Sequence, residues 1–164
     1  MAIYLNDTPK KGWSKKGTPC IVKTKKSLIK KRYTIGMGID INSNIEFTLI
    51  EGLLKQDKLI GFFNKFNKKT INNKTFFMDN ASIHKSKKTT SFIKKTNMKV
   101  IYNIPYCSEL NPIEYVFSLL RKKLLEKEVK NEKDILNIIL NFKKEINKEH
   151  IKNIFNKCIN EMKN

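Results

Sequence analysis

Residues 76–84 read Phe76-Phe77-Met78-Asp79-Asn80-Ala81-Ser82-Ile83-His84, an apolar segment that runs directly into an aspartate. The pattern predicts a short buried strand at 75–78, followed by a helix at 83–97. Because the ligands of open α/β sheets gather at the carboxyl ends of the strands, we expect Asp79 to present its carboxylate at such an edge. The same residues allow a second interpretation, in which Asp79, Asn80 or Ser82 only caps the following helix.

A second polar segment precedes a predicted helix at 112–125. It reads Ile104-Pro105-Tyr106-Cys107-Ser108-Glu109-Leu110-Asn111-Pro112-Ile113-Glu114. Asn111 suits the N-cap and Pro112 the first helical position, so Glu114 falls where a capping box places its acid. The rigid first turn also fixes the direction of the Glu114 carboxylate, as a metal ligand requires. Glu114 and Asp79 together could bind one divalent cation, because Mg²⁺ uses one or two carboxylates along with phosphate oxygens and water.

The remaining elements follow from the hydrophobic periodicity on either side of these segments. Further strands are predicted at 3–5, 19–24, 33–39, 45–50 and 99–102, and further helices at 55–66, 133–146 and 148–162. The strands at 33–39 and 45–50 are joined by turn-prone residues and form a predicted hairpin. Antiparallel strands followed by alternating helices and strands predict an α/β fold, with a mixed sheet flanked by helices.

The end of the chain differs in composition from the rest. We expect one domain at 1–130 and a C-terminal helical extension at 131–164, whose two helices carry apolar stripes. These stripes are expected to pack on the domain, and a dimer contact is the alternative. The extension holds seven Lys and five acidic residues, so it carries only +2 of the net charge.

The net charge points to an anionic partner. The 164 residues contain 34 Lys and Arg against 15 Asp and Glu, a net charge of +19, and +17 of it lies before residue 131. Nucleic acid is the first partner that such a charge suggests, and an anionic membrane surface is the second. Codon bias in an AT-rich genome is the competing explanation, since Lys, Asn and Ile are abundant throughout, but it predicts a more even distribution.

Several classes of protein are excluded by composition. There is no apolar run of 18 residues, so we expect no transmembrane helix, and the first residues do not form a signal peptide. The three cysteines, Cys20, Cys107 and Cys158, are odd in number and widely spaced, unlike a disulfide framework. A reducing intracellular compartment is therefore expected, without secretion or membrane attachment.

The two polar segments together resemble a known family. Residues 78–86 and 105–114, with 34 residues between Asp79 and Glu114, resemble the DDE-type catalytic domain of mariner-like transposases and their bacterial insertion-sequence relatives. The segment Trp13-Ser14-Lys15-Lys16-Gly17 resembles the Gly-Trp stretch of the bacterial branch. The resemblance covers about residues 2–126. It implies a ribonuclease H-like fold, Mg²⁺ or Mn²⁺ as cofactor, and cleavage and transfer of DNA strands.

The resemblance also implies roles for particular residues. Asp79 matches the second catalytic carboxylate of the family and Glu114 the third, and both would bind metal, with two ions expected in a complete site. DNA, as transposon ends and target, is the implied partner, and a homodimer is possible since cut-and-paste transposition pairs two ends. Localisation would follow the DNA, in the nucleus of a eukaryotic host or otherwise in the cytoplasm or nucleoid. The residues expected to contact DNA are Lys15, Lys16, Lys85, Lys87 and Lys88.

The first catalytic carboxylate of the family has no evident counterpart. In the family it ends the first strand, and the corresponding position would fall just upstream of Met1. Asp7 could replace it if the following loop were shortened, whereas Asp40 lies in the hairpin turn. The resemblance therefore predicts an N-terminally truncated transposase with a truncated first strand, which is inactive if the first carboxylate is missing. The alternative is a non-catalytic, basic nucleic-acid-binding remnant on the same fold.

Four polar or aromatic residues of these motifs receive structural rather than chemical roles. His84 is expected to be an exposed or cap-region residue, and Trp13 to be a packing residue rather than one that stacks on bases. Tyr106 and Asn111 are expected to shape the loop that precedes the helix of Glu114.

Overall fold

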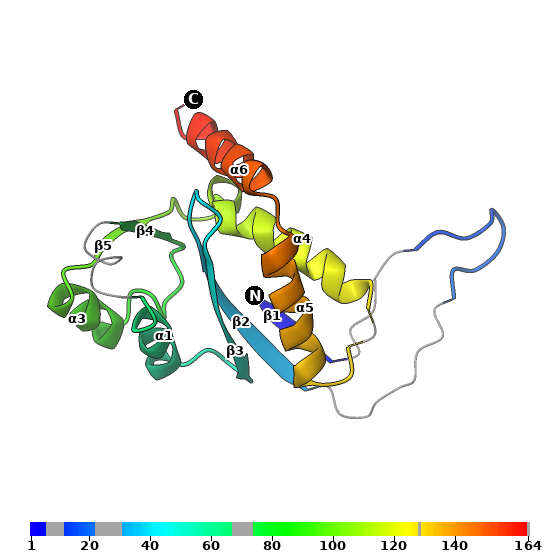
Figure 1. The fold of residues 1–164 in the computed structure, drawn as a ribbon, viewed down its shortest axis with the longest axis horizontal. Coiled ribbons are helices and arrows are strands. Elements are labelled where there is room, and N and C mark those ends of the chain that lie inside the picture. Colours follow the sequence, from blue (N-terminus) through cyan, green and yellow to red (C-terminus); the bar gives the residue numbers. More distant parts are fainter. Residues whose placement is uncertain (6–11, 22–30, 67–73, 128, 164) are drawn as a thin grey trace.

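The computed structural model describes residues 1–5, 12–21, 31–66, 74–127 and 129–163. Figure 1 shows these residues as a set of strands covered by helices. The elements are, in chain order, β1 (Ala2–Tyr4), β2 (Arg32–Ile39), β3 (Ile45–Glu51), α1 (Gln56–Phe63), β4 (Thr75–Met78), α3 (Lys87–Lys95), β5 (Lys99–Tyr102), the 3-10 helix η1 (Ser108–Leu110), α4 (Pro112–Leu125), α5 (Glu132–Glu145) and α6 (Lys148–Glu161).

The strands combine antiparallel and parallel pairing, as predicted. β1, β2 and β3 form an antiparallel sheet in which β2 is central, and β4 pairs with β5 in parallel. The two pairings lie in separate sheets among the described residues. The predicted hairpin is confirmed, because Asp40 Oδ1 accepts hydrogen bonds from Asn42 N (2.9 Å) and Asn44 N (3.0 Å) and so closes the turn between β2 and β3.

The described elements fall into two halves, each with its own core. The first half contains β1, β2, β3, η1, α4, α5 and α6, and the second contains α1, β4, α3 and β5. Figure 1 shows the second half, in teal and green, beside the first. The buried core of the first half is aliphatic for the most part and includes Ile35, Leu120, Ile139 and Ile151. The smaller core of the second half consists of Leu59, Phe62, Phe63, Met78 and Met98.

The chain crosses between the halves twice, and each crossing contains a residue with positive φ. Gly52 (φ +84°) follows β3, and a side chain there would meet nothing within 4 Å. Tyr106 (φ +65°) lies between β5 and η1. A left-handed conformation at a non-glycine residue costs about 1–3 kcal/mol and persists only where the surroundings enforce it. The Tyr106 side chain is fully exposed (104 %), so the constraint comes from the backbone of the loop.

Contacts between the halves concentrate near the tip of the β2–β3 hairpin. Gly38 of β2 leaves room for two rings of the second half, since a Cβ there would lie 3.4 Å from Phe66 and 3.6 Å from Phe62. Lys74 forms an ion pair with Asp40. The halves are therefore joined by a small apolar contact and by an ion pair, in addition to the two chain connections.

The C-terminal helices pack as expected. The predicted apolar stripes of α5 and α6 enter the core of the first half, together with residues of β2 and α4. The interpretation that these helices pack on the domain is confirmed, and the division of the chain at residue 130 stays a prediction. No helix in the described part of the chain is long and apolar enough to cross a membrane.

Three expectations about local structure are corrected. Residues 19–21 do not form a strand, and the rest of the strand predicted at 19–24 lies outside the described residues. The helix predicted from residue 83 begins at Lys87, because Ser86 accepts a hydrogen bond from Thr89 N (3.3 Å) as the N-cap. Trp13 is fully exposed (102 %), so it does not pack on the described residues.

Candidate functional site

Asp79 lies directly after β4, where the ends of β4 and β5 are tied together. Asn103 N donates to Met78 O (2.8 Å), and Asn80 Nδ2 donates to Asn103 O. The Asp79 side chain closes a tight turn, because its Oδ1 accepts from Ala81 N (3.1 Å). Since Ser86 caps α3, the interpretation that Asp79, Asn80 or Ser82 serves as that cap is wrong.

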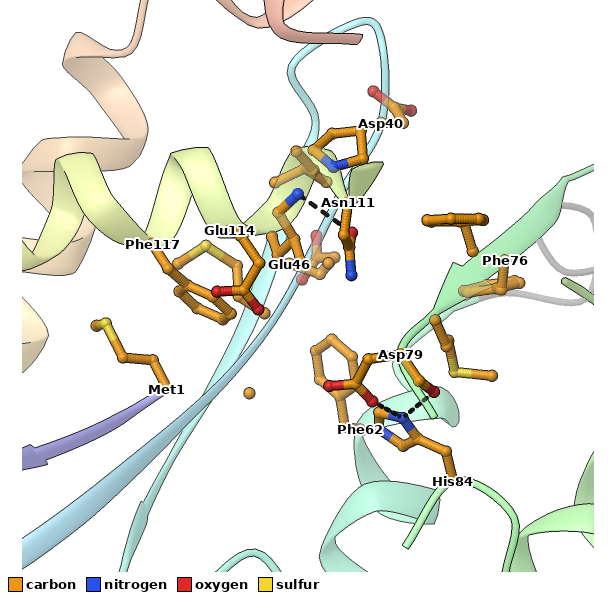
Figure 2. Close-up of a pocket in the computed structure, with 18 of the residues that line it drawn as sticks. Met1, Asp40, Glu46, Phe62, Phe76, Asp79, His84, Asn111, Glu114 and Phe117 are labelled. Atoms are coloured by element: carbon orange, nitrogen blue, oxygen red, sulfur yellow. Dashed lines mark hydrogen bonds and ion pairs between the residues drawn. The ribbon is translucent and has the colours of Figure 1, made fainter. Parts of the chain in front are cut away.

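His84 binds the Asp79 carboxylate. Its Nδ1 lies 2.8 Å from Asp79 Oδ1 and 3.3 Å from the main-chain oxygen of the same residue (Figure 2). The hydrogen bond from His84 lowers the pKa of Asp79; partial burial raises it, and the bond from Ala81 N lowers it further. His84 was expected to be exposed or to lie in the cap region; its side chain is only 19 % exposed, and it lies two residues before the N-cap Ser86, which agrees with the cap-region interpretation.

Glu114 lies in the first turn of α4, and the start of that helix is set by its neighbours. Asn111 is the N-cap and accepts from Ile113 N (3.4 Å), and Pro112 occupies the first turn, as predicted. Asn111 N donates to Ser108 O (3.0 Å), so it is not available to a capping-box acid. The exposed Glu114 side chain has no hydrogen bond or ion pair with any described residue and is therefore free to bind a ligand.

Both carboxylates line one cavity between the halves. The cavity has a volume of about 1270 Å³ and is lined by residues of β2, β4, α1, α4 and α6. Figure 2 shows Asp79 and Glu114 on its two sides. The Met1 amino group lies close enough to both carboxylates to interact with them electrostatically. Burial lowers the pKa of this amino group, and Glu114 and Asp79 offset part of that decrease. The two candidate ligands predicted from sequence are thus brought to one space.

The donor set of the cavity suits a hard cation. Two carboxylates can bind Mg²⁺ or Mn²⁺ when phosphate oxygens and water complete the coordination. Within the described ranges, no three His, Cys, Asp or Glu side chains are grouped closely enough to form a metal site by themselves. Asp40 also lines the cavity, but Asn42, Asn44 and Lys74 already occupy its carboxylate. Asp7, the other candidate acid, lies outside the described residues.

The lysines predicted to contact DNA are all exposed but lie in two places. Lys85, Lys87 and Lys88 follow the Asp79 turn and begin α3, whereas Lys15 and Lys16 belong to residues 12–21. Lys85 Nζ lies 5.0 Å from the centre of the Tyr102 ring, and Lys88 forms an ion pair with Asp57. Their role in binding DNA stays a prediction.

One cationic residue of the cavity was not singled out from the sequence. Arg121 lines the cavity and lies on α4 seven residues after Glu114. Residues two helical turns apart share a face, so the position of Glu114 already indicates that Arg121 points to the same side. The seven-residue spacing from Glu114 was the sequence signal for Arg121. This spacing becomes informative only when the helix face that carries Glu114 is known to border the cavity.

Solved structures share this arrangement of strands and helices. A Mos1 strand transfer complex matches with a TM-score of 0.80 and 17 % identity, covering 99 % of this chain and 50 % of that one. A Mos1 mariner paired end complex with Mn matches with a TM-score of 0.80 and 15 % identity, over 99 % and 52 %. The catalytic domain of Mos1 mariner transposase matches with a TM-score of 0.66 and 18 % identity, over 79 % and 69 %. The fold is therefore the ribonuclease H-like α/β fold.

The family follows from the sequence as a whole. A family model described as DDE superfamily endonuclease matches residues 1–136, which is most of the chain. The chain belongs to the DDE superfamily endonuclease family. It spans about half the length of the Mos1 chains in the two complexes. Comparison with curated protein sequences gives no match.

Proposed function

We propose that the protein acts in DNA transposition, as a metal-dependent endonuclease and strand transferase. The observation that supports this proposal is the placement of Asp79 and Glu114, which come from different halves of a DDE-family chain and face one cavity. A phosphodiester would be hydrolysed first, and the freed 3′ hydroxyl would attack target DNA by the same in-line displacement. DNA is the proposed substrate and partner, inside the cell, and pairing of two transposon ends would require a homodimer.

The carboxylates act by holding cations against the phosphate. Mg²⁺ or Mn²⁺, as two ions in a complete site, would activate water and neutralise the leaving oxygen. Asp79 and Glu114 would supply oxygen ligands from the two halves, on opposite sides of the cavity, which would fix the position of the scissile phosphate between them. Asp7 is the remaining candidate for a third carboxylate. Arg121 reaches the same cavity from α4 and would hold a phosphate oxygen.

The exposed lysines would hold the DNA backbone. Lys87 and Lys88 occupy the first turn of α3, which contains no acidic residue. Positive charge at a helix N-terminus is unfavourable by a few tenths to about 1 kcal/mol, because the helix dipole is positive there. A DNA phosphate at this position would reverse the sign of that interaction. Lys85 lies next to His84, just before the N-cap Ser86, and Lys15 and Lys16 would extend the contact along the DNA.

A nicking assay on supercoiled DNA with Mn²⁺ tests the catalytic proposal. Asp79→Asn and Glu114→Gln should each reduce nicking by at least about 100-fold, since each removes a ligand charge that positions the reacting phosphate. Glu132→Gln is the matched control, because Glu132 is an exposed carboxylate of α5 that does not line the cavity. Nicking that persists in both cavity variants would contradict the proposal.

A second candidate is a non-catalytic protein that binds nucleic acid through its basic surface. It is favoured by the finding that, in the described ranges, no three His, Cys, Asp or Glu side chains are grouped closely enough to hold a metal ion by themselves. Such a protein would bind DNA with little sequence preference and would not nick it with Mg²⁺ or Mn²⁺. DNA binding by the wild-type protein without nicking, unchanged in Asp79→Asn, would support this second candidate.

Either candidate predicts a salt-dependent contribution from the lysines of α3. Lys87→Ala should weaken DNA binding and reduce the slope of log K against log salt concentration by about 0.9, as expected for the loss of one phosphate contact. Lys144→Ala, which removes an exposed lysine of α5 in the other half, should leave the slope unchanged. Fluorescence anisotropy at salt concentrations from about 50 to about 200 mM measures the slope for each variant. Equal slopes for Lys87→Ala and the wild type would remove Lys87 from the DNA contact.

A further inference from the structure

The two oxygens of the Asp79 carboxylate have different surroundings. Oδ1 accepts from Ala81 N at 3.1 Å and lies 2.8 Å from His84 Nδ1. Oδ2 has no partner among the described residues. In Figure 2 the oxygen that is not bound to His84 points toward the side of the cavity on which Glu114 lies. One oxygen is thus fixed from behind while the other faces the cavity.

The chemistry of these contacts determines which atom of His84 carries a proton. Nδ1 lies between Asp79 Oδ1 and Asp79 O, at 2.8 and 3.3 Å, and both are acceptors. Nδ1 must therefore be the donor, in either the neutral or the charged form of the ring. A carboxylate that accepts two hydrogen bonds through one oxygen cannot rotate without breaking both.

His84 is itself held in place. Tyr102 Oη donates to His84 O (3.2 Å), and Lys85 Nζ lies over the Tyr102 ring at 5.0 Å. The His84 side chain is 19 % exposed, whereas that of Asp79 is 53 % exposed. The donor is thus more buried than the carboxylate that it orients, as expected for a residue that supports a ligand from behind.

We propose that His84 is a positioning residue for the metal site, which fixes Oδ1 of Asp79 so that Asp79 binds a divalent cation through Oδ2 alone. This inference rests on the proposed function, because it assumes that Asp79 is a metal ligand. It adds that the ligand is monodentate and that its direction is set before the cation arrives. Glu114 differs, since it has no anchoring contact with the described residues and can adjust to the ion.

The expected effect of losing the anchor is large enough to measure. Groups that hydrogen-bond to metal ligands typically contribute 10- to 100-fold to metal affinity, because they fix the ligand in the binding orientation. In His84→Ala the bond from Ala81 N remains, so we expect the low end of this range, about a 10-fold loss of Mn²⁺ affinity. His84→Asn places an amide N–H near the position of Nδ1 and should recover most of the loss.

The experiment measures Mn²⁺ binding by calorimetry, with free Mn²⁺ counted by electron paramagnetic resonance. His84→Asn carries no charge, so recovery of affinity in this variant separates orientation from loss of a positive charge. Five proteins are compared: the wild type, His84→Ala, His84→Asn, Asp79→Asn and His150→Ala. His150 is the second histidine of the chain and lies in α6, so His150→Ala controls for the loss of an imidazole and should bind Mn²⁺ as the wild type does.

The outcomes separate this inference from the function on which it rests. Weaker binding in His84→Ala, recovery in His84→Asn and no change in His150→Ala would support it. Unchanged affinity in His84→Ala, together with lost binding in Asp79→Asn, would overturn the role of His84 and leave the metal site intact. Failure of His84→Asn to recover would overturn the hydrogen-bond explanation. No Mn²⁺ binding by the wild type would overturn both the site and the inference.

Tyr102→Phe provides a milder variant if His84→Ala does not fold. It removes the hydrogen bond to His84 O but keeps the aromatic ring, and unchanged Mn²⁺ affinity in this variant would count against the inference.

Discussion

The two halves of the molecule hold their carboxylates by different means. In the second half Asp79 is fixed by side-chain and main-chain hydrogen bonds within one turn, from His84 and Ala81. In the first half Glu114 is positioned only by the start of its helix, through Asn111 and Pro112. One carboxylate is therefore oriented by hydrogen bonds to its own atoms, whereas the other is oriented only by the backbone of its helix.

The difference reflects the cores behind the two residues. α4 is anchored in a large core, where Val116 and Leu120 are fully buried, so the helix itself is a rigid support. β4 has four residues and only one of them, Met78, is buried in the second core. A short strand on a small core holds its last residue weakly, and the local hydrogen bonds then fix the orientation of the Asp79 side chain. We infer that the polar network around Asp79 compensates for the small core beneath it.

The largest expected effect comes from breaking each core in turn. Leu120→Ala in the first core and Met98→Ala in the second should each reduce the free energy of unfolding by about 2–5 kcal/mol, the usual range for such truncations. Because strong contacts between elements stay within one half, each variant should lower hydrogen-exchange protection mainly in its own sheet.

The measurement combines urea denaturation, followed by far-UV circular dichroism, with residue-resolved hydrogen exchange in β2 and β4. The fluorescence of Trp13 is unsuitable as a probe, since that side chain is fully exposed. If either variant lowers protection equally in both sheets, the halves unfold as one cooperative unit and the comparison between them fails.

A smaller effect should follow from removing the helix cap behind Glu114. Asn111→Ala should cost about 1 kcal/mol of stability, because Ile113 N loses its acceptor, and it should also weaken Mn²⁺ binding. Asn131→Ala removes a cap of the same kind from α5, whose capping box pairs Asn131 with Asp134. The control should reduce stability similarly without changing Mn²⁺ affinity. Equal Mn²⁺ affinity in the two variants would show that the start of α4 does not position Glu114.

The smallest effect concerns the ion pair that joins the halves. Burial raises the pKa of Asp40, but hydrogen bonds from Asn44 and Lys74 lower it more, and the net pKa lies below the ordinary value of 3.8. A carboxyl whose folded pKa is depressed stabilises the folded state above its unfolded pKa and loses this contribution as the pH falls through the folded pKa. Asp40→Asn should therefore be less stable than the wild type near neutral pH, and the difference should shrink below about pH 4.

Urea denaturation at several pH values between neutrality and acid checks this expectation. Asp57→Asn, which removes an exposed ion pair within the second half, is the control and should change stability by less than about 0.5 kcal/mol. A difference between Asp40→Asn and the wild type that stays constant down to acid pH would contradict the role assigned to the Asp40 carboxylate.

Much of the fold could be predicted from sequence because its signals are local. The helix at 112–125 and the strands at 75–78 and 99–102 have the predicted bounds, since apolar spacing, Asn111 and Pro112 all agree. The helix predicted from residue 83 failed because Ile83 fits the apolar pattern while its backbone belongs to a turn, and Ser86 is the better cap. The two separate sheets could not be predicted either, since pairing between distant strands has no local signal.

The candidate site shows the same limit. Sequence motifs identified Asp79 and Glu114, and the structure places both at one cavity. The contact between His84 and Asp79 was missed, because a contact between residues five apart across a turn depends on the backbone path and not on a helical or strand period. The turn is closed by His84 N, which donates to Ala81 O (2.9 Å), and this bond brings the ring to the carboxylate.

The two crossings at Gly52 and Tyr106 make the second half an insertion, tethered at both ends within the first. The distance between Asp79 and Glu114 then depends on the backbone conformation at these two crossings as well as on the carboxylate side chains. A cation held by both carboxylates would join the insertion to its host at a third point. By thermodynamic linkage, whatever brings the insertion closer to its host strengthens cation binding, and the cation favours the closer arrangement by the same factor.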